Sequence, residues 1–143
     1  MLERADIHIE VPRVDYEKLS GNKISETSDV IRQHVQATRS IQQIRFTNHN
    51  PRLAKKGSST NIICNADMRI GKIRKFCQLQ DVGESLMRAA ISQLQLIARA
   101  YAQRHRILKL SRTIADSAGS EEIQSAHLAE ALQYRLKIMM GIC

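Results

Sequence analysis

The 143-residue sequence is poor in aromatic residues, glycine and proline. It contains two Phe, three Tyr and no Trp, together with six Gly and two Pro. A β-sandwich or barrel needs many tight turns, which this composition does not supply. Leu, Ile, Ala, Gln and Arg are abundant instead and favour helices packed by aliphatic side chains. With 43% hydrophobic and 25% charged residues, the sequence fits one mainly α-helical domain with a core of its own.

Cysteines are also few, and long apolar runs are missing. Three thiols, at positions 64, 77 and 143, form no paired framework and indicate reduced cysteines in the cytoplasm. The sequence has no apolar stretch of signal-peptide length and no run near the ~20 apolar residues that span a membrane. Cys64, Cys77, His105 and His127 match no zinc-ligand spacing, so structural burial is favoured over metal binding. We expect a cytoplasmic chain with no metal and no membrane partner.

Positive charge is plentiful and concentrated. The formal net charge is +8, and ten Lys and Arg residues lie between Arg69 and Arg112 against only Asp81 and Glu84. Such a field attracts nucleic acid, nucleotide phosphates or an acidic protein surface, although a solvated helix face explains the same charges. The densest cluster predicts a DNA-binding surface that neutralises phosphates without reading sequence; it comprises Arg69, Lys72, Arg74 and Lys75. Only Phe76 is near for stacking, so single-strand recognition has weak support.

The alternation Ile7-His8-Ile9-Glu10-Val11, stopped by Pro12, predicts one isolated N-terminal strand. No other segment reads as a strand, so this one indicates the last edge of a sheet that lies outside the sequence, or a stretch that is flexible without that sheet. The segment 47–61 is polar, contains Pro, Gly and Ser, and has no periodicity, which predicts a long disordered loop.

Helical periodicity accounts for most of the remaining chain. We expect a small helical bundle of four helices, with two further short helical turns at 70–77. The four helices are predicted from Ser25 or Ser28 to about Phe46, over 79–94, from about Tyr101 to a stop at Gly119, and from Ser120 through Leu132, with 136–143 as a tail.

The order of several short motifs resembles one family, the C-terminal domain of magnesium-chelatase-like AAA+ ATPases of the competence-protein (ComM) type. The motifs are LERADIHIEVP at 2–12, CNADM at 64–68, HRILK at 105–109, RTIAD at 112–116, AGSEEI at 118–123, and HLAEAL with Tyr134-Arg135 at the end. This resemblance implies that 1–19 ends an AAA+ core and that 20–135 is a helical lid that folds over ATP.

The resemblance also implies partners and cofactors. ATP with Mg²⁺ would bind in the full-length parent to a preceding core domain, and neighbouring subunits of a ring would complete the site. The sequence has no G-x-x-x-x-G-K-[ST] loop and no strand ending in paired acids, so it is not expected to hydrolyse ATP or bind a cofactor alone. ATP-driven remodelling of DNA is the process that the resemblance favours. Metal insertion into a porphyrin is the alternative within the family.

Two sites for arginines follow from the resemblance. Arg4, just before the predicted strand, stands where related ATPases present an arginine to the neighbour's nucleotide, whose γ-phosphoryl charge a planar cation can stabilise. The family's lid arginine should begin the long helix, and Arg99 in Ala98-Arg99-Ala100-Tyr101 is the first choice. Three extra residues, Ala102-Gln103-Arg104, separate this motif from His105-Arg106, and Ile97 replaces a usual capping serine. Because three residues are nearly one turn, either Arg99 or Arg104 can face the nucleotide, and Arg99 is slightly favoured.

A function of another class remains open from the residues alone. The same charge can belong to a stand-alone basic helical domain that binds DNA or acts as an adaptor. A helix-turn-helix would need two compact helices and a recognition helix, and no such pair stands out. DNA affinity that depends on salt and not on nucleotide would favour this alternative.

Overall fold

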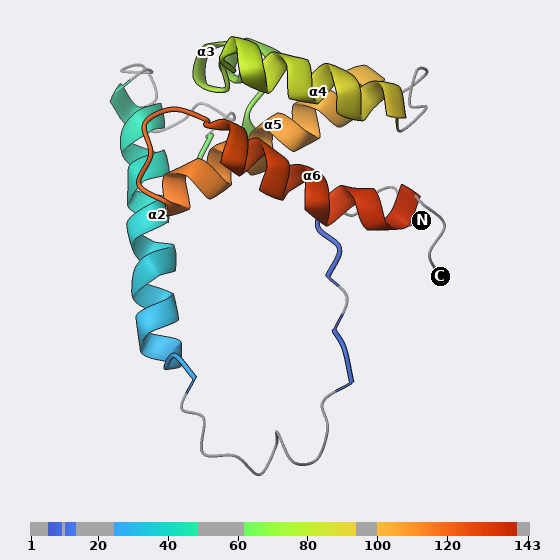
Figure 1. The fold of residues 1–143 in the computed structure, drawn as a ribbon. Helices are drawn as coiled ribbons and strands as arrows, with labels where there is room; N and C mark the ends of the chain where they lie inside the picture. Colours follow the sequence, from blue (N-terminus) through green and yellow to red (C-terminus); the bar gives the residue numbers. More distant parts are fainter. Residues whose placement is uncertain (1–5, 10, 14–24, 49–61, 94–99, 140–143) are drawn as a thin grey trace.

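The computed structural model describes residues 6–9, 11–13, 25–48, 62–93 and 100–139. Within these ranges the chain forms five α-helices and one short 3₁₀ helix, and no sheet (Figure 1). The helices are α2 (Ser28–Asn48), η3 (Asn65–Asp67), α3 (Ile70–Phe76), α4 (Asp81–Gln93), α5 (Ala100–Ser117) and α6 (Ser125–Met139). The predicted mainly α-helical bundle is confirmed.

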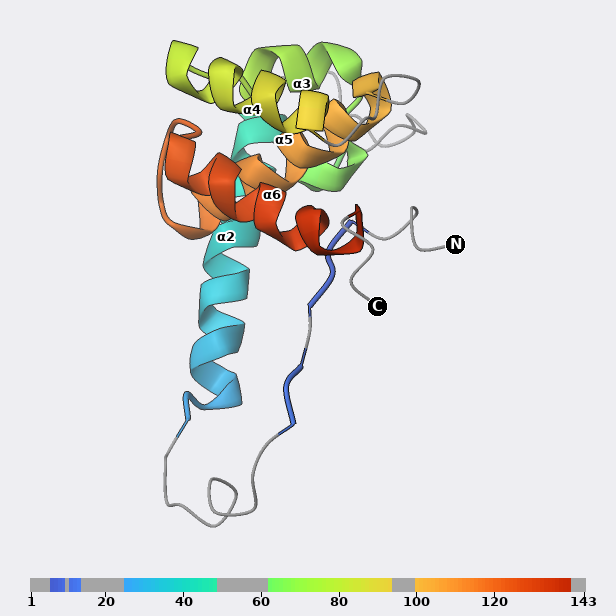
Figure 2. The same ribbon diagram turned by 45° about the vertical axis from the view of Figure 1, so that its right-hand side comes forward.

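Helix α5 is the centre of the bundle. It packs against α2, η3, α3, α4 and α6, and α4 also packs against α6. The N-terminal half of α2 extends away from the other helices in both ribbon views (Figures 1 and 2). Apolar residues on this half are consequently half exposed, among them Ile31 at 50% and Val35 at 45%. The bundle therefore encloses only the C-terminal part of α2.

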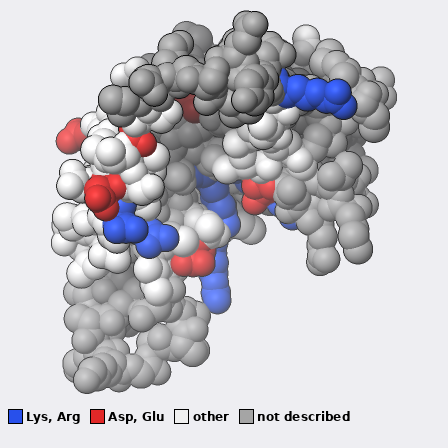
Figure 3. Space-filling view, turned by 90° about the horizontal axis from the view of Figure 1, so that it is seen from below, with Lys and Arg blue, Asp and Glu red and all other residues white. Residues whose placement is uncertain are grey.

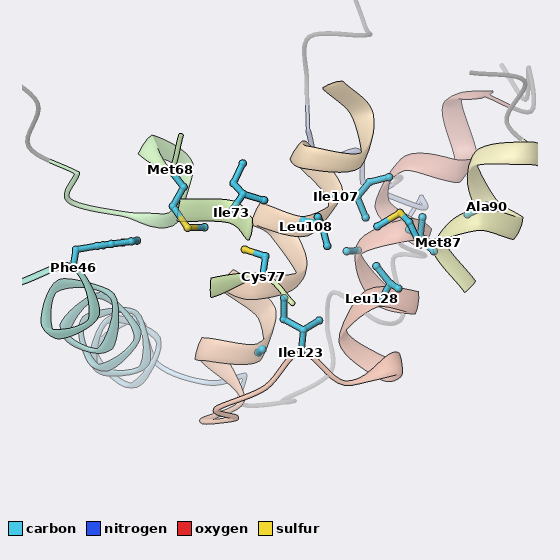
Figure 4. Close-up of a cluster of buried hydrophobic side chains, with 13 residues drawn as sticks. Phe46, Met68, Ile73, Cys77, Met87, Ala90, Ile107, Leu108, Ile123 and Leu128 are labelled. Carbon is cyan, nitrogen blue, oxygen red and sulfur yellow. The ribbon is translucent and has the colours of Figure 1, made fainter. Parts of the chain in front are cut away.

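The core lies between α5 and its neighbours (Figure 4). Leu128, Ala115 and Ala131 have no exposed surface, and Met87 and Ile107 are each 1% exposed. Their aliphatic side chains come from α4, α5 and α6, whose apolar stripes were visible as helical periodicity. The remaining core members are Phe46, Met68, Ile73, Cys77, Ala90, Leu108, Ile123 and Leu132.

Glycine ends α5 as predicted. Gly119 has φ of 68°, a left-handed conformation that glycine adopts without strain. The amide of Gly119 donates to the carbonyl of Asp116 at 3.1 Å, and the amide of Ser120 donates to that of Ala115 at 2.8 Å. These two bonds satisfy carbonyls at the helix end, so the turn into the next segment is fixed by local chemistry.

The start of the last helix was predicted five residues too early. Ser120 belongs to the C-terminal turn of α5, and Ile123, 3% exposed, forms an isolated parallel bridge with Leu79. α6 begins only at Ser125. The acidic run Glu121-Glu122 looked like a first helical turn, but pairing across the bundle holds this segment extended.

The predicted strand is wrong for the described residues 6–9 and 11–13, which have no strand pairing. Ile7, Ile9 and Val11 are 50%, 72% and 81% exposed. The amide of His8 donates to the carbonyl of Tyr134 at 3.2 Å instead. A strand needs a neighbouring strand for its backbone hydrogen bonds, whereas the residue that accepts from His8 lies in helix α6.

Two smaller boundaries also differ. Thr47 and Asn48 belong to α2 rather than to the predicted loop, of which 49–61 lies outside the described residues. The predicted tail from 136 is helical as far as Met139, and 140–143 are not described. None of the helices described here has the length and apolar character needed to cross a bilayer.

Candidate functional site

A cavity of about 350 Å³ lies between α3, α4 and the first turns of α5. Three cationic or titratable side chains line it, namely Arg74, Arg104 and His105, together with the carboxylate of Glu84. Apolar residues and a thiol complete its wall: Ile73, Cys77, Leu79 and Leu108, beside Gln78. This combination of an apolar wall and converging cations is typical of sites for anions.

Arg104 is held at this cavity by Glu84. An Nη2 atom of the guanidinium donates to the Glu84 Oε1 atom at 2.5 Å, from α5 to α4. Each side chain keeps 36% of its surface exposed. The ion pair therefore fixes the direction of Arg104 while leaving part of the guanidinium open to solvent.

The field of the cavity acts on His105. Burial lowers the pKa of its imidazole, and the nearby charges of Arg104, Arg74 and Lys109 lower it further. The lowered pKa thus reflects burial first and the surrounding positive charges second. The Cys77 thiol adds no negative charge to the wall, since burial raises its pKa to about 12, and Glu84 is the carboxylate in the lining.

The four cations predicted to form one DNA surface are placed on different sides of α3. Lys72 and Lys75 lie over the Phe76 ring, with Nζ atoms 5.7 and 5.6 Å from its centroid. Arg74 instead lines the Arg104 cavity. Lys75 lines a separate cavity of about 310 Å³, which Arg45 and Arg112 also reach. Arg69 is exposed just before α3.

The opposite face of the molecule has a mixed charge. Figure 3 views the molecule from the end away from α3, where basic and acidic side chains are interspersed among uncharged ones on the described surface. Of the other predicted site residues, Arg4 and Arg99 lie outside the described residues, and their placement stays a prediction.

A buried charge cluster is the feature that the sequence analysis missed. The Asp116 carboxylate, with no exposed surface, accepts from Arg45, from Asn65 Nδ2 at 2.8 Å and from Arg112 Nε at 3.0 Å. Arg112 also donates hydrogen bonds to the carbonyls of Ser120 and Glu121, at 2.6 and 2.8 Å. These bonds hold the pKa of Asp116 below its usual value despite the opposing effect of burial.

Signals for this cluster were present in the sequence. Arg45 continues the apolar stripe of α2, where a charged residue must be paired if it is buried. Arg112 and Asp116 stand four residues apart, the spacing at which helical side chains meet. Asn65 belongs to the CNADM motif, and its side chain lies against Thr113 and Asp116. The cluster joins α2, η3 and α5, so it positions the bundle rather than a ligand.

No group of three or more His, Cys, Asp or Glu side chains is arranged to hold a metal ion among the residues that the structure describes. The candidate site that gathers arginines in this helical domain is the cavity beside the first turns of its central helix.

Comparison with known proteins gives the family. The family described as magnesium chelatase, subunit ChlI C-terminal, matches residues 25–135, and the chain belongs to it. Competence protein ComM of Haemophilus influenzae is 37% identical over 141 residues, which cover 97% of this chain and 24% of that protein. The uncharacterized protein YifB of Escherichia coli is 32% identical over 135 residues, covering 94% and 23%. The resemblance to magnesium-chelatase-like proteins of the ComM type is confirmed, and the chain spans about a quarter of the length of these relatives.

Proposed function

We propose that this chain is the lid part of a magnesium-chelatase-like AAA+ ATPase and supplies arginines to an ATP site that a core domain completes. The carrying observation is the placement of Arg104, which the Glu84 ion pair directs along a cationic cavity at the start of α5. Family membership adds support, because the lid arginine is expected at the start of this helix.

The residues of the cavity fit the phosphate groups of ATP. Arg74 and Arg104 carry permanent charge, and the guanidinium geometry matches phosphate oxygens. ATP with Mg²⁺, held by the core domain, would bring negative charge to the guanidinium groups of Arg74 and Arg104. In this proposal the arginines of the chain bind and orient the phosphate groups.

Coupling would follow from the position of α5. A phosphate contact at its first turns pulls on the helix that packs against all the others, so the whole bundle moves as one body. In a ring, Arg4 would contact the nucleotide of a neighbouring subunit. Remodelling of DNA is the process we favour, since one relative is named as a competence protein.

The test is the ATPase rate of the full-length parent carrying Arg4→Ala, Arg99→Ala or Arg104→Ala, with and without DNA. We expect Arg4→Ala and one of the other two to lower turnover by at least about tenfold while nucleotide still binds, because an arginine that meets the transition state contributes that much or more. Arg88→Ala, an exposed arginine on α4, is the matched control and should leave the rate unchanged. Full activity in all three variants would refute the lid assignment.

A stand-alone DNA-binding or adaptor function has one observation in its favour. Lys72 and Lys75 each place an ammonium group over the Phe76 ring, so two cations gather around one part of α3. DNA binding by the chain that is equal with and without ATP, combined with unaffected ATPase variants, would establish this alternative instead.

A further inference from the structure

We propose that the cavity between α3 and α5 is a polyphosphate site in which Arg74 is a second phosphate ligand beside Arg104, and in which Glu84 occupies the guanidinium of Arg104 until phosphate replaces it. The inference rests on the proposed function and deepens it. It moves Arg74 from the DNA surface to the nucleotide site, and it assigns a competing role to Glu84.

Helix geometry separates Arg74 from its basic neighbours. Successive residues of an α-helix point about 100° apart, so Arg74 and Lys75 face different directions. The structure bears this out, because Lys75 lies over Phe76 whereas Arg74 lines the cavity with Arg104. Arg74 also has no ion-pair partner among the described residues. A cation that lines a cavity and forms no ion pair within the described part of the chain is available to an anion.

The cavity has the size and environment for phosphate groups. Its volume of about 350 Å³ corresponds to on the order of ten water molecules at about 30 Å³ each, which leaves room for several phosphate groups. Ile73 and Leu108, both 3% exposed, form part of the wall. An apolar wall lowers the local dielectric constant and strengthens the attraction between guanidinium groups and an anion.

Glu84 is suited to an exchange rather than to a permanent pair. It and Arg104 are both one-third exposed, and ion pairs of this kind contribute little net free energy because water and salt screen them. A phosphate carries more charge than a carboxylate and accepts the same two parallel N–H bonds. Polyphosphate can therefore displace Glu84, after which the freed carboxylate turns to solvent.

The experiment measures binding of inorganic tripolyphosphate to this chain by calorimetry. Arg74→Ala should weaken binding about tenfold, the loss expected for one charge-assisted contact. Lys75→Ala removes the same charge from the next residue on another side of the helix, and we expect a change within about twofold, since exposed charges farther away are screened. Glu84→Gln keeps the shape of the side chain and should tighten binding about twofold to fivefold by releasing Arg104.

Three outcomes would overturn the proposal. Equal weakening by Arg74→Ala and Lys75→Ala would indicate general attraction to the basic surface. Weaker or unchanged binding in Glu84→Gln would remove the exchange. If Arg74→Ala weakened binding of a 20-base-pair DNA duplex as much as binding of tripolyphosphate, Arg74 would be a DNA contact rather than a nucleotide ligand. Circular dichroism and thermal unfolding of each variant verify that the fold is retained.

Failure here and failure of the proposed function can be told apart. Tripolyphosphate binding tests the cavity in this chain alone, whereas the ATPase variants test the parent. Binding as expected together with a fully active Arg104→Ala parent would keep the cavity as a phosphate site and refute its role in ATP hydrolysis. No binding by the chain, with loss of ATPase in Arg104→Ala, would refute the cavity and keep the lid.

Discussion

The Asp116 carboxylate connects three segments that are distant in the sequence. Arg45 reaches it from α2, Asn65 from η3, and Arg112 from within α5. Buried charges are costly unless each is paired and hydrogen-bonded, and here two guanidinium groups and one amide meet that need. The cluster therefore fixes the orientation of α2 on α5. Hydrogen bonds and ion pairs are directional, whereas apolar contacts are not.

Asp116→Asn should lower the free energy of unfolding by about 3–5 kcal/mol, because it leaves Arg112 and Arg45 without their shared counter-charge while keeping the shape of the side chain. Urea unfolding followed by circular dichroism measures the change. Asp29→Asn is the matched control, since Asp29 pairs with Arg32 at 3.5 Å on the surface and should change stability by less than about 0.5 kcal/mol. Similar losses in both variants would contradict the buried pairing.

Protonation of His105 should make the free energy of unfolding depend on pH in the weakly acidic to neutral range. Its folded pKa is lowered, so below the ordinary value of 6.5 the unfolded chain binds more protons than the folded chain. The free energy of unfolding should accordingly fall as pH drops from about 7.5 through 6.5 toward the lowered folded pKa. Asp67 and Asp116 have pKa values lowered from 3.8 and act only at more acidic pH.

The corresponding prediction compares wild type with His105→Gln in urea at pH 7.5 and pH 5.5. Wild type should lose more stability between the two pH values than the variant, because only wild type has this imidazole to protonate on unfolding. An identical pH dependence in both proteins would mean that burial and the nearby cations do not lower the pKa of His105 in solution.

A glycine in a left-handed conformation ends α5. Gly119 adopts a left-handed φ, and a Cβ atom there would meet no atom within 4 Å. Gly119→Ala should therefore cost about 1 kcal/mol from backbone strain alone. Gly71, in the first turn of α3, also has open space for a Cβ atom and has no such φ, so Gly71→Ala should stabilise by about 0.5–1 kcal/mol. Thermal unfolding tests this opposition in sign, and two changes of the same sign would contradict it.

The helical elements were largely predictable, and their ends were predictable where a local signal sets them. α2, α4 and α5 follow apolar periodicity, α3 was expected as two short helical turns, and Gly119 marks the end of α5. The strand at 7–11 and the early start of α6 failed for a shared reason. Alternation and acidic caps are local signals, whereas the partners that decided these segments, Tyr134 for His8 and Leu79 for Ile123, are distant in sequence.

At the scale of the whole molecule, the basic residues of α3 fall into two groups. Lys72 and Lys75 lie over the Phe76 ring, and Arg74 lines the Arg104 cavity. If DNA binds the chain, Lys72 and Lys75 belong to the binding side, and the double variant Lys72→Ala/Lys75→Ala should reduce the slope of log affinity against log salt by about 2. Arg74→Ala should leave that slope nearly unchanged, because Arg74 lines the Arg104 cavity. Fluorescence anisotropy of a labelled duplex at several salt concentrations measures both. An equal effect of Arg74→Ala would mean that all the basic residues act as one surface.

The sequence alone determined the class of the fold, the helices and the family. Helical periodicity is local, and family motifs are strings of residues, so both can be read without coordinates. Only the tertiary structure decided which charges meet. It joined Arg45, Asn65, Arg112 and Asp116 in one buried cluster, and it turned Arg74 away from Lys75 toward Arg104. The physical reason is that electrostatic contacts depend on distances across the bundle, which follow from how helices pack and not from the order of residues along one of them.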